Sequence, residues 1–514
     1  MRLGKGVVLP ILMQSLAVAA QPPARTPGGG VSVVFVEPDG ETARGELPLY
    51  RGVTDPSRLA ELSGFLENDA ARWALDLYAR ARGMTVARGG TSAQPAEYLI
   101  ALVPGGNDAA VGLRLRTTKG IESRPTVAFV QLGPEEWRFS TTLLHETGHV
   151  ALSMLAGGRV LPKREIAAIP HTVAALSDRG TAFDEGFAIS LETLIAHLSA
   201  APEVRREYRH EQFLFGQAAK MRAEYYRPSV DLLTFAQTYA RYGDVRDNAF
   251  AFGPAFTEPD YLRVQMEKAR DFASLRDANQ LLQSEGFHAT FFFSLLVHGD
   301  KAPSEATVQA RQNAVMTVLA ETFATTPFTP ESPLLLQFLE TYKNRYPAEW
   351  GEVLDVFLDI SHGVFVDPEA GSLWRAHYLA ALALDLGHLD RGRIDAARER
   401  WRLKVTVDPS VLYSRLGPQL RCEVAGRTVT LVALESARPL SLDVNTAEEG
   451  VIRLVPGISD AEVATWQAHR VHRPFTNFDD FRKRSGLRER TLAQLSIPRC
   501  FAAHAPRAGV GGDR

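Results

Sequence analysis

Two histidines four residues apart, His145 and His149, lie within the mostly apolar run TTLLHETGHVALSML, residues 141–155. This spacing is typical of a helix, because residues i and i+4 share one helix face. Two imidazoles on one face can bind the same metal ion, and the pattern His-Glu-x-x-His is typical of zinc. The sequence therefore predicts a helix from Thr142 to Leu155 with a zinc site on one side.

Glu146 follows the first histidine directly, so the same helix carries a carboxylate beside the predicted metal. A carboxylate there can take a proton from a water molecule that zinc has made more acidic. Glu146 is therefore the candidate general base. An amphipathic helix with two surface histidines would show the same pattern, so a second signal is needed to favour a metal site.

The second signal lies downstream in FDEGFAISLE, residues 183–192. A catalytic zinc commonly has three protein ligands and a fourth position for water. Glu185 opens an apolar stretch with helical spacing, predicted to end at Ser199, and can present its carboxylate to the same ion. His171 is the alternative third ligand, or a donor to the reacting carbonyl oxygen, or a loop histidine. Asp184 is either a competing carboxylate or a helix cap.

These two motifs resemble those of the gluzincin zinc peptidases, especially the aminopeptidase branch, in which the glutamate of an NEGFA-type motif is the third ligand. The similar stretch here is DEGFA, residues 184–188, and Glu192 matches a further glutamate of that branch. The resemblance implies peptide hydrolysis and one Zn²⁺ per chain, held by His145, His149 and Glu185. The GxMEN-type motif that recognises a free amino end is absent, so aminopeptidase specificity is not implied.

Two further roles stay open at this point. Glu192 either orients a ligand histidine or lies on the surface. The residue that stabilises the negative charge on the reacting oxygen is not singled out by any pattern. The candidates for that role are Tyr225, Tyr226, Tyr242 and His288.

The order of predicted elements indicates an α+β fold in which a small sheet precedes a mostly helical lobe. The resemblance to the gluzincins implies that this is a thermolysin-like catalytic region. One long helix, at residues 57–84, is predicted before the first histidine. Four strand-like runs also precede it, at residues 31–37, 98–103, 111–116 and 127–132. The predicted domains are a signal peptide (1–20), an N-terminal sheet-containing lobe (31–135), a helical zinc metallopeptidase lobe (136–405), a β-hairpin connector (406–440), a helix-hairpin-helix domain (441–500) and a disordered tail (501–514).

The N-terminus has the three parts of a secretory signal peptide. Arg2 and Lys5 are basic, residues 6–19 are mostly apolar, and small alanines follow. The apolar run is shorter than the roughly 20 residues that span a bilayer. We therefore expect an exported protein, periplasmic or secreted, with no membrane span after signal removal. In such a compartment Cys422 and Cys500 can form a disulfide or remain two buried thiols.

The segment from Leu442 to Leu487 resembles the helix-hairpin-helix domain of DNA-uptake competence proteins. The matching pieces are NTA (445–447), LVPGI (454–458), Arg470, PF (474–475) and FDDF (478–481). Such hairpins bind phosphate through backbone N–H groups, but here the acidic Asp460 and Glu462 follow Gly457. Nine Lys/Arg face eight Asp/Glu over residues 442–500, so nucleic acid is not the expected partner. A protein partner or a structural role is expected instead.

The formal net charge of −3 on 514 residues gives no sign of an obligatory nucleic-acid or membrane partner. The main interpretation is an exported zinc-dependent peptidase that acts on peptide or protein substrates. The alternative is an exported DNA- or protein-binding protein with a structural or vestigial zinc site. The motif is also compatible with hydrolysis of a non-peptide amide or ester.

Overall fold

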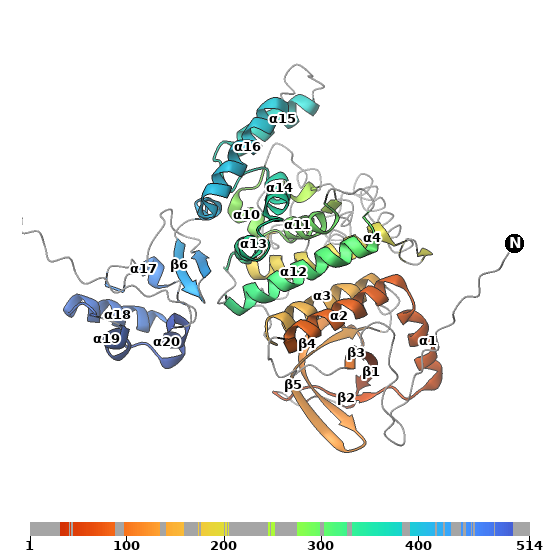
Figure 1. Cartoon of the computed structure of the whole chain (residues 1–514). Helices are drawn as coiled ribbons and strands as arrows, with labels where there is room; N and C mark the ends of the chain where they lie inside the picture. Colours follow the sequence, from red (N-terminus) through yellow and green to blue (C-terminus); the bar gives the residue numbers. More distant parts are fainter. Residues whose placement is uncertain are drawn as a thin grey trace, which may run out of the picture. The chain divides into compact units, whose positions relative to one another are not determined.

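The structure is a computed structural model of the whole chain (Figure 1). It describes residues 31–40, 42, 45–87, 97–133, 140–158, 173, 176–199, 201–202, 204, 245–246, 248–251, 275–298, 303–325, 332–382, 391–416, 419–424, 427–432, 444–445, 449–453, 455, 458–476 and 478–496. The chain divides into two compact units, residues 1–160 with 187–225, and residues 161–186 with 226–514. The signal-peptide region and the C-terminal tail lie outside the described residues.

The first unit contains a five-stranded barrel that closes in the order β1-β2-β4-β5-β3. Its strands are β1 (Ser32–Pro38), β2 (Leu49–Gly52), β3 (Glu97–Leu102), β4 (Asn107–Thr117) and β5 (Gly120–Leu132). β1 pairs antiparallel with β2, and β4 with β5; the pairs β1–β3, β2–β4 and β3–β5 are parallel. The α+β class is therefore correct, but the predicted small sheet is a closed barrel. Its closure depends on β2, whose four residues are too few to show a strand pattern in the sequence.

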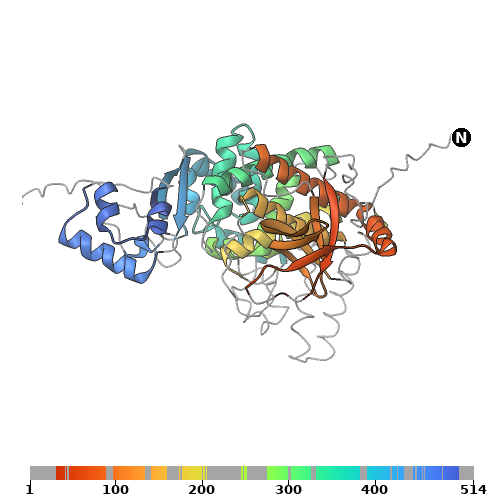
Figure 2. The ribbon, with the colours of Figure 1, turned by 90° about the horizontal axis from the view of Figure 1, so that it is seen from below.

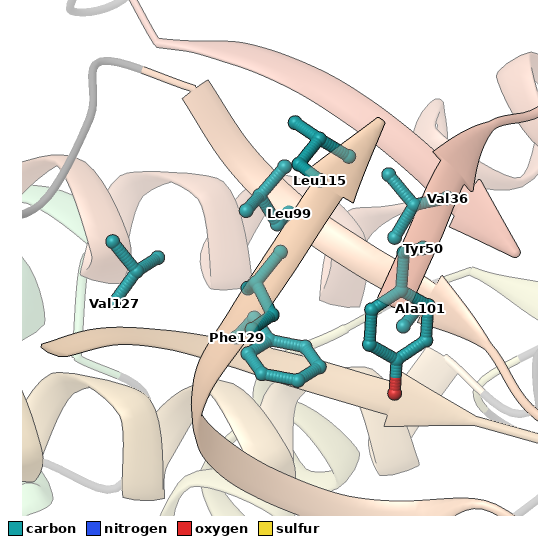
Figure 3. Packing of buried hydrophobic residues seen from close by; sticks show 8 residues of the cluster. Val36, Tyr50, Leu99, Ala101, Leu115, Val127 and Phe129 are labelled. Carbon is teal, nitrogen blue, oxygen red and sulfur yellow. The ribbon is translucent and has the colours of Figure 1, made fainter. Parts of the chain in front are cut away.

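Apolar side chains from all five strands form the barrel core (Figure 3). Successive side chains of a strand point to opposite faces, so alternate residues of each strand contribute. The core residues are Val36, Tyr50, Leu99, Ala101, Leu113, Leu115, Val127 and Phe129. Tyr50 and Phe129 meet edge to face, with ring centroids 5.6 Å apart. On the other face of β3, Tyr98 is directed to helix α3 and bonds to Thr147.

The helix predicted over residues 57–84 is two helices, α1 (Pro56–Leu66) and α2 (Asp69–Ala87). The side chain of Asn68 accepts a hydrogen bond from the N–H of Ala71 at 2.8 Å, as an N-cap residue does. The chain therefore ends one helix and starts another at this point. The prediction of one continuous helix is wrong because the apolar spacing continues across the break.

Helix α3 (Ser140–Leu155) carries the two histidines and ends where the sequence predicts. Gly157 and Gly158 follow it with φ values of 75° and 79°, a conformation that glycine adopts without strain. The N–H of Gly158 bonds to the carbonyl of Ser153 and that of Gly157 to Met154. This is the Schellman pattern that closes a helix.

Helix α4 (Arg179–Leu198) begins six residues earlier than predicted. Asp178 caps it, accepting from the N–H of Thr181 at 2.9 Å and from its hydroxyl at 2.8 Å. Asp184 therefore lies inside the helix, and its predicted alternative role as a cap is wrong. The single helix α4 starts in the second unit and ends in the first.

The second unit is helical around a buried central helix, α11 (Glu285–Val297). Its phenylalanines contact aromatic rings of neighbouring helices and of the turn after α14; Phe291 lies 5.9 Å from Phe338 between ring centroids, and Phe287 stacks on Phe365 with centroids 6.3 Å apart. The other helices are α10 (Ala278–Leu282), α12 (Glu305–Thr325), α13 (Leu334–Arg345), α14 (Trp350–Ser361), α15 (Ala370–Leu382) and α16 (Arg391–Val407), with 3-10 turns η2 (Ala249–Ala251) and η3 (Pro409–Tyr413). Figure 2 shows the helices and the barrel from below.

The predicted hairpin is formed by β6 (Gln419–Val424) and β7 (Arg427–Val432), which pair antiparallel with Cys422 opposite Val429. Cys500 lies outside the described residues, so the disulfide stays a prediction. Within the described part of the chain, none of the helices has the length and apolar character needed to cross a membrane.

The C-terminal segment is helical in its described residues, with α17 (Glu449–Ile452), α18 (Asp460–His472), α19 (Phe478–Arg484) and α20 (Glu489–Ser496). Its core is aromatic: the rings of Trp466 and Phe475 lie 4.8 and 4.9 Å from that of Phe481. Asn445 bonds to the backbone of Phe475 in both directions, at 2.9 and 2.6 Å. These contacts hold the start of the segment against the stretch between α18 and α19.

Candidate metal centre

The two histidines of α3 point their Nε2 atoms at each other. His145 and His149 are half-buried, and their Nε2 atoms are 3.1 Å apart. Two nitrogen ligands about 2.0–2.1 Å from one tetrahedral zinc lie about 3.3 Å from each other. The spacing of the two nitrogens therefore matches that of two ligands of one ion, which is the arrangement that the four-residue spacing predicts.

Glu185 of α4 completes a group of three. One ligand atom each from His145, His149 and Glu185 lie within 4.8 Å of one another. Glu185 is buried, so its carboxylate is largely shielded from bulk water. Among the described residues, this is the one group of three or more His, Cys, Asp or Glu side chains close enough to hold a metal.

The chemistry of this donor set fits zinc. Two imidazole nitrogens and one carboxylate oxygen are a ligand set of catalytic zinc sites, in which a fourth position stays open for water. A calcium or magnesium site would instead need mainly oxygen donors. The residues present therefore fit a catalytic zinc better than a hard cation.

Glu192 lies beside the first histidine, with its Oε1 3.3 Å from Nδ1 of His145. Seven residues separate Glu185 from Glu192, which is almost two helix turns, so both carboxylates share one face of α4. A buried carboxylate at Nδ1 favours the tautomer with the proton on Nδ1. That tautomer leaves the Nε2 lone pair available for a metal. Of the two alternatives for Glu192, the surface position is wrong, because the residue is buried.

Glu146 lies between the two histidines on α3 and is also buried. Burial is the main cause that raises the pKa of Tyr98 far above its usual range, and the negative charge of Glu146 acts in the same direction. This carboxylate is therefore close enough to Tyr98 to influence its ionisation.

Gly148 allows α3 and α4 to approach closely. A Cβ atom at this position would lie 3.1 Å from the Leu191 side chain and 3.2 Å from the Cα of Ala188. The sequence shows only the cost of a glycine inside a helix. The structure shows its reason, since this contact brings the face with the histidines against the face with the two glutamates.

His288 does not belong to the metal group. It lies on α11, completely buried, with Nε2 3.0 Å from the carbonyl of Leu282 and its ring edge against Phe183. Burial lowers the pKa of His288 to about 4, so the ring is neutral at pH 7. Its Cβ lies where a side chain at Gly186 would have to be, which explains the glycine of the DEGFA motif.

The remaining candidates named from the sequence lie outside the described residues. They are His171, the alternative third ligand, and the three tyrosines considered for the reacting oxygen, Tyr225, Tyr226 and Tyr242.

The acidic residues of the C-terminal hairpin have partners within the module. Ser459 and Glu462 form a capping box at the start of α18. Glu462 also accepts from the N–H of Arg488 at 3.0 Å and the hydroxyl of Thr491 at 2.9 Å, and it pairs with the Arg488 side chain. Asp460 pairs with Arg453. The first N–H groups of α18 thus have an internal acceptor at the place where a phosphate would bind.

No protein-family model matches this chain, and neither the curated proteins nor the solved structures contain a significant match.

Proposed function

We propose that this protein is an exported zinc-dependent peptidase with a gluzincin-like, thermolysin-like catalytic region. The observation that carries the proposal is the convergence of His145, His149 and Glu185 from two packed helices. Two further buried carboxylates, Glu146 and Glu192, accompany them. These acids lie in the same buried region as the two imidazoles, and we propose that one Zn²⁺ per chain binds there, where its positive charge would stabilise carboxylates shielded from water.

Each residue has a defined task in this proposal. His145 and His149 offer Nε2 lone pairs, Glu185 offers a carboxylate oxygen, and Glu192 holds the proton on Nδ1 of His145. When bound, zinc lowers the pKa of water towards neutrality and polarises a carbonyl group. Glu146 takes the proton from the attacking water on its carboxylate and delivers it to the nitrogen of the leaving amine.

The substrate class is proposed from the resemblance of the two motifs to peptidases, since the same residues could hydrolyse another amide or an ester. Export is proposed from the N-terminal pattern of a basic start, an apolar run and small residues. For the C-terminal segment we propose a protein-docking or structural role. The internal capping of α18 by Ser459 and Glu462 supports this role over DNA binding.

The test of the catalytic proposal is Glu146→Gln in the mature chain. Glutamine keeps the size of the side chain but cannot accept the proton, so zinc content should stay the same. Cleavage of a peptide library should fall by about 100-fold or more. Glu122→Gln, on the exposed part of β5, is the matched control and should keep full activity.

Two results would contradict the proposal. Undiminished hydrolysis by Glu146→Gln would remove this residue from the reaction. Zinc bound by a wild-type chain that cleaves no peptide of the library would favour the alternative function, a binding protein with a structural zinc.

A further inference from the structure

A hydroxyl chain links the barrel to the helix that carries the histidines. Tyr98 of β3 is completely buried, and its hydroxyl bonds to Thr147 of α3. The hydroxyl of Thr147 in turn donates to the carbonyl of Leu143 at 2.6 Å. Because Thr147 has one hydroxyl proton and gives it to Leu143, Tyr98 must be the donor in the first bond.

The ring of Tyr98 is itself held in place. It stacks on Tyr78 of α2 with ring centroids 4.3 Å apart and an interplanar angle of 27°. Tyr78 donates its hydroxyl to the carbonyl of Glu97 at 3.0 Å, and Glu97 is the neighbour of Tyr98 on β3. Burial also keeps the Tyr98 hydroxyl protonated by raising its pKa. The Tyr98 hydroxyl is therefore held in position as the donor to Thr147.

Thr147 lies on the side of α3 opposite the metal ligands. With about 100° per residue, its side chain is rotated by roughly 160–200° from those of His145 and His149. The ligand side of α3 packs against α4 at Gly148, within reach of Ala188. The helix is thus fixed from the rear by Tyr98 and from the front by α4.

The rotation of α3 about its axis decides where both Nε2 atoms lie. Cα atoms lie about 2.3 Å from a helix axis, and Nε2 extends roughly 4–5 Å further, so a rotation of about 10° moves Nε2 by about 1 Å. Metal sites tolerate only about 0.5 Å of misplacement. A directional bond behind the helix is therefore well placed to hold the ligands in register.

We propose that Tyr98 is a positioning residue for the metal centre, acting through Thr147 to set the rotation of α3 and with it the placement of His145 and His149. This inference rests on the proposed zinc site. It goes beyond it by assigning a role to Tyr98, which lies outside both motifs, and to Thr147, which occupies one of the two variable positions of the His-Glu-x-x-His pattern.

The experiment measures zinc affinity in the full mature chain by competition with a chelator, together with the visible spectrum of the Co²⁺-substituted protein. Tyr98→Phe removes only the hydroxyl and should weaken zinc binding by about tenfold, as loss of a residue that orients a ligand does. It should also shift the cobalt bands. Thr147→Val should give the same loss, whereas Thr147→Ser keeps the hydroxyl and should bind zinc like the wild type.

Tyr78→Phe is the matched control, because it removes a buried tyrosine hydroxyl from the same stacked pair, and this hydroxyl bonds to the carbonyl of Glu97 on β3. It should lower the melting temperature as much as Tyr98→Phe while leaving zinc affinity within twofold. The double variant Tyr98→Phe/Thr147→Val should bind zinc no more weakly than either single variant, because both changes break one chain.

The outcomes separate this inference from the proposed function. If Tyr98→Phe binds zinc like the wild type, or loses no more affinity than Tyr78→Phe, the positioning role is refuted while the metal site stands. If the wild-type chain binds neither zinc nor cobalt, the metal site is refuted and the positioning role with it.

Discussion

Glu192 is the single residue whose contact most clearly tests how the ligands are oriented. Its carboxylate lies 3.3 Å from Nδ1 of His145. Glu192→Ala removes this acceptor and should weaken zinc binding by about 10- to 100-fold. Glu192→Gln should have a smaller effect, because its amide oxygen can still accept a hydrogen bond from Nδ1. Zinc competition titrations measure both losses.

Thr193→Val is the control for this prediction. Thr193 follows Glu192 on α4, is buried, and donates its hydroxyl to the carbonyl of Ile189. Its replacement should leave zinc affinity unchanged. Equal losses for Glu192→Ala and Thr193→Val would mean that any buried polar change in α4 disturbs the site, and would remove the specific role of Glu192.

For single residues, the sequence predicts a contact when a short-range pattern, such as helix spacing or a short motif, connects the two residues. His145 and His149 meet because they are one helix turn apart, and Glu185 was found through the DEGFA pattern. The bond between Tyr98 and Thr147 joins residues 49 positions apart. No local period connects them, so this contact could be found only in the folded chain.

Among the helices and strands, the start of α18 predicts how the stability of the C-terminal helices depends on pH. Glu462 is buried and accepts hydrogen bonds from Ser459, Arg488 and Thr491. Its pKa is held well below the usual range, mainly by the bond from the Arg488 side chain. A lowered folded-state pKa adds stability above the unfolded pKa of about 4.3, and this stability is lost as the pH falls further.

The C-terminal helices should therefore melt at progressively lower temperature as the pH falls below about 4.3. Calorimetry of the full chain measures this, with the transition of residues 444–496 identified by its absence from a truncated chain. Glu462→Gln should lower that transition at pH 7 and flatten its dependence on acid. The same acid dependence in wild type and Glu462→Gln would show that other carboxylates cause it.

The sequence predicts the ends of helices and the pairing of strands less well than it predicts which segments are helical. The helix predicted from Thr142 to Leu155 differs from α3 by two residues at its start and by none at its end, because the apolar run with helical spacing covers most of the helix. The sequence misplaces the start of α4, since the cap Asp178 lies among polar residues that look like loop. Barrel closure could not be predicted either, because it depends on pairings between strands distant in the chain, such as β2 with β4.

For the whole molecule, the proposed catalytic residues and the C-terminal module are separate in the chain. The metal group lies on α3 and α4, whereas the aromatic core of the module is formed within residues 444–496. A chain that ends before Ser441 should therefore keep zinc and cleave peptides at a rate within about twofold of the full chain. Loss of zinc together with hydrolysis in this truncation would contradict the separation.

The central claim is that one zinc is held by His145, His149 and Glu185. The most direct measurement is the metal content of the purified mature chain after chelation, reloading with zinc and removal of the excess. The wild type should retain about one zinc per chain, and His149→Ala should lose most of it. His197→Ala, an exposed histidine near the end of α4, should keep the full amount. Equal zinc in the wild type and His149→Ala would contradict the account.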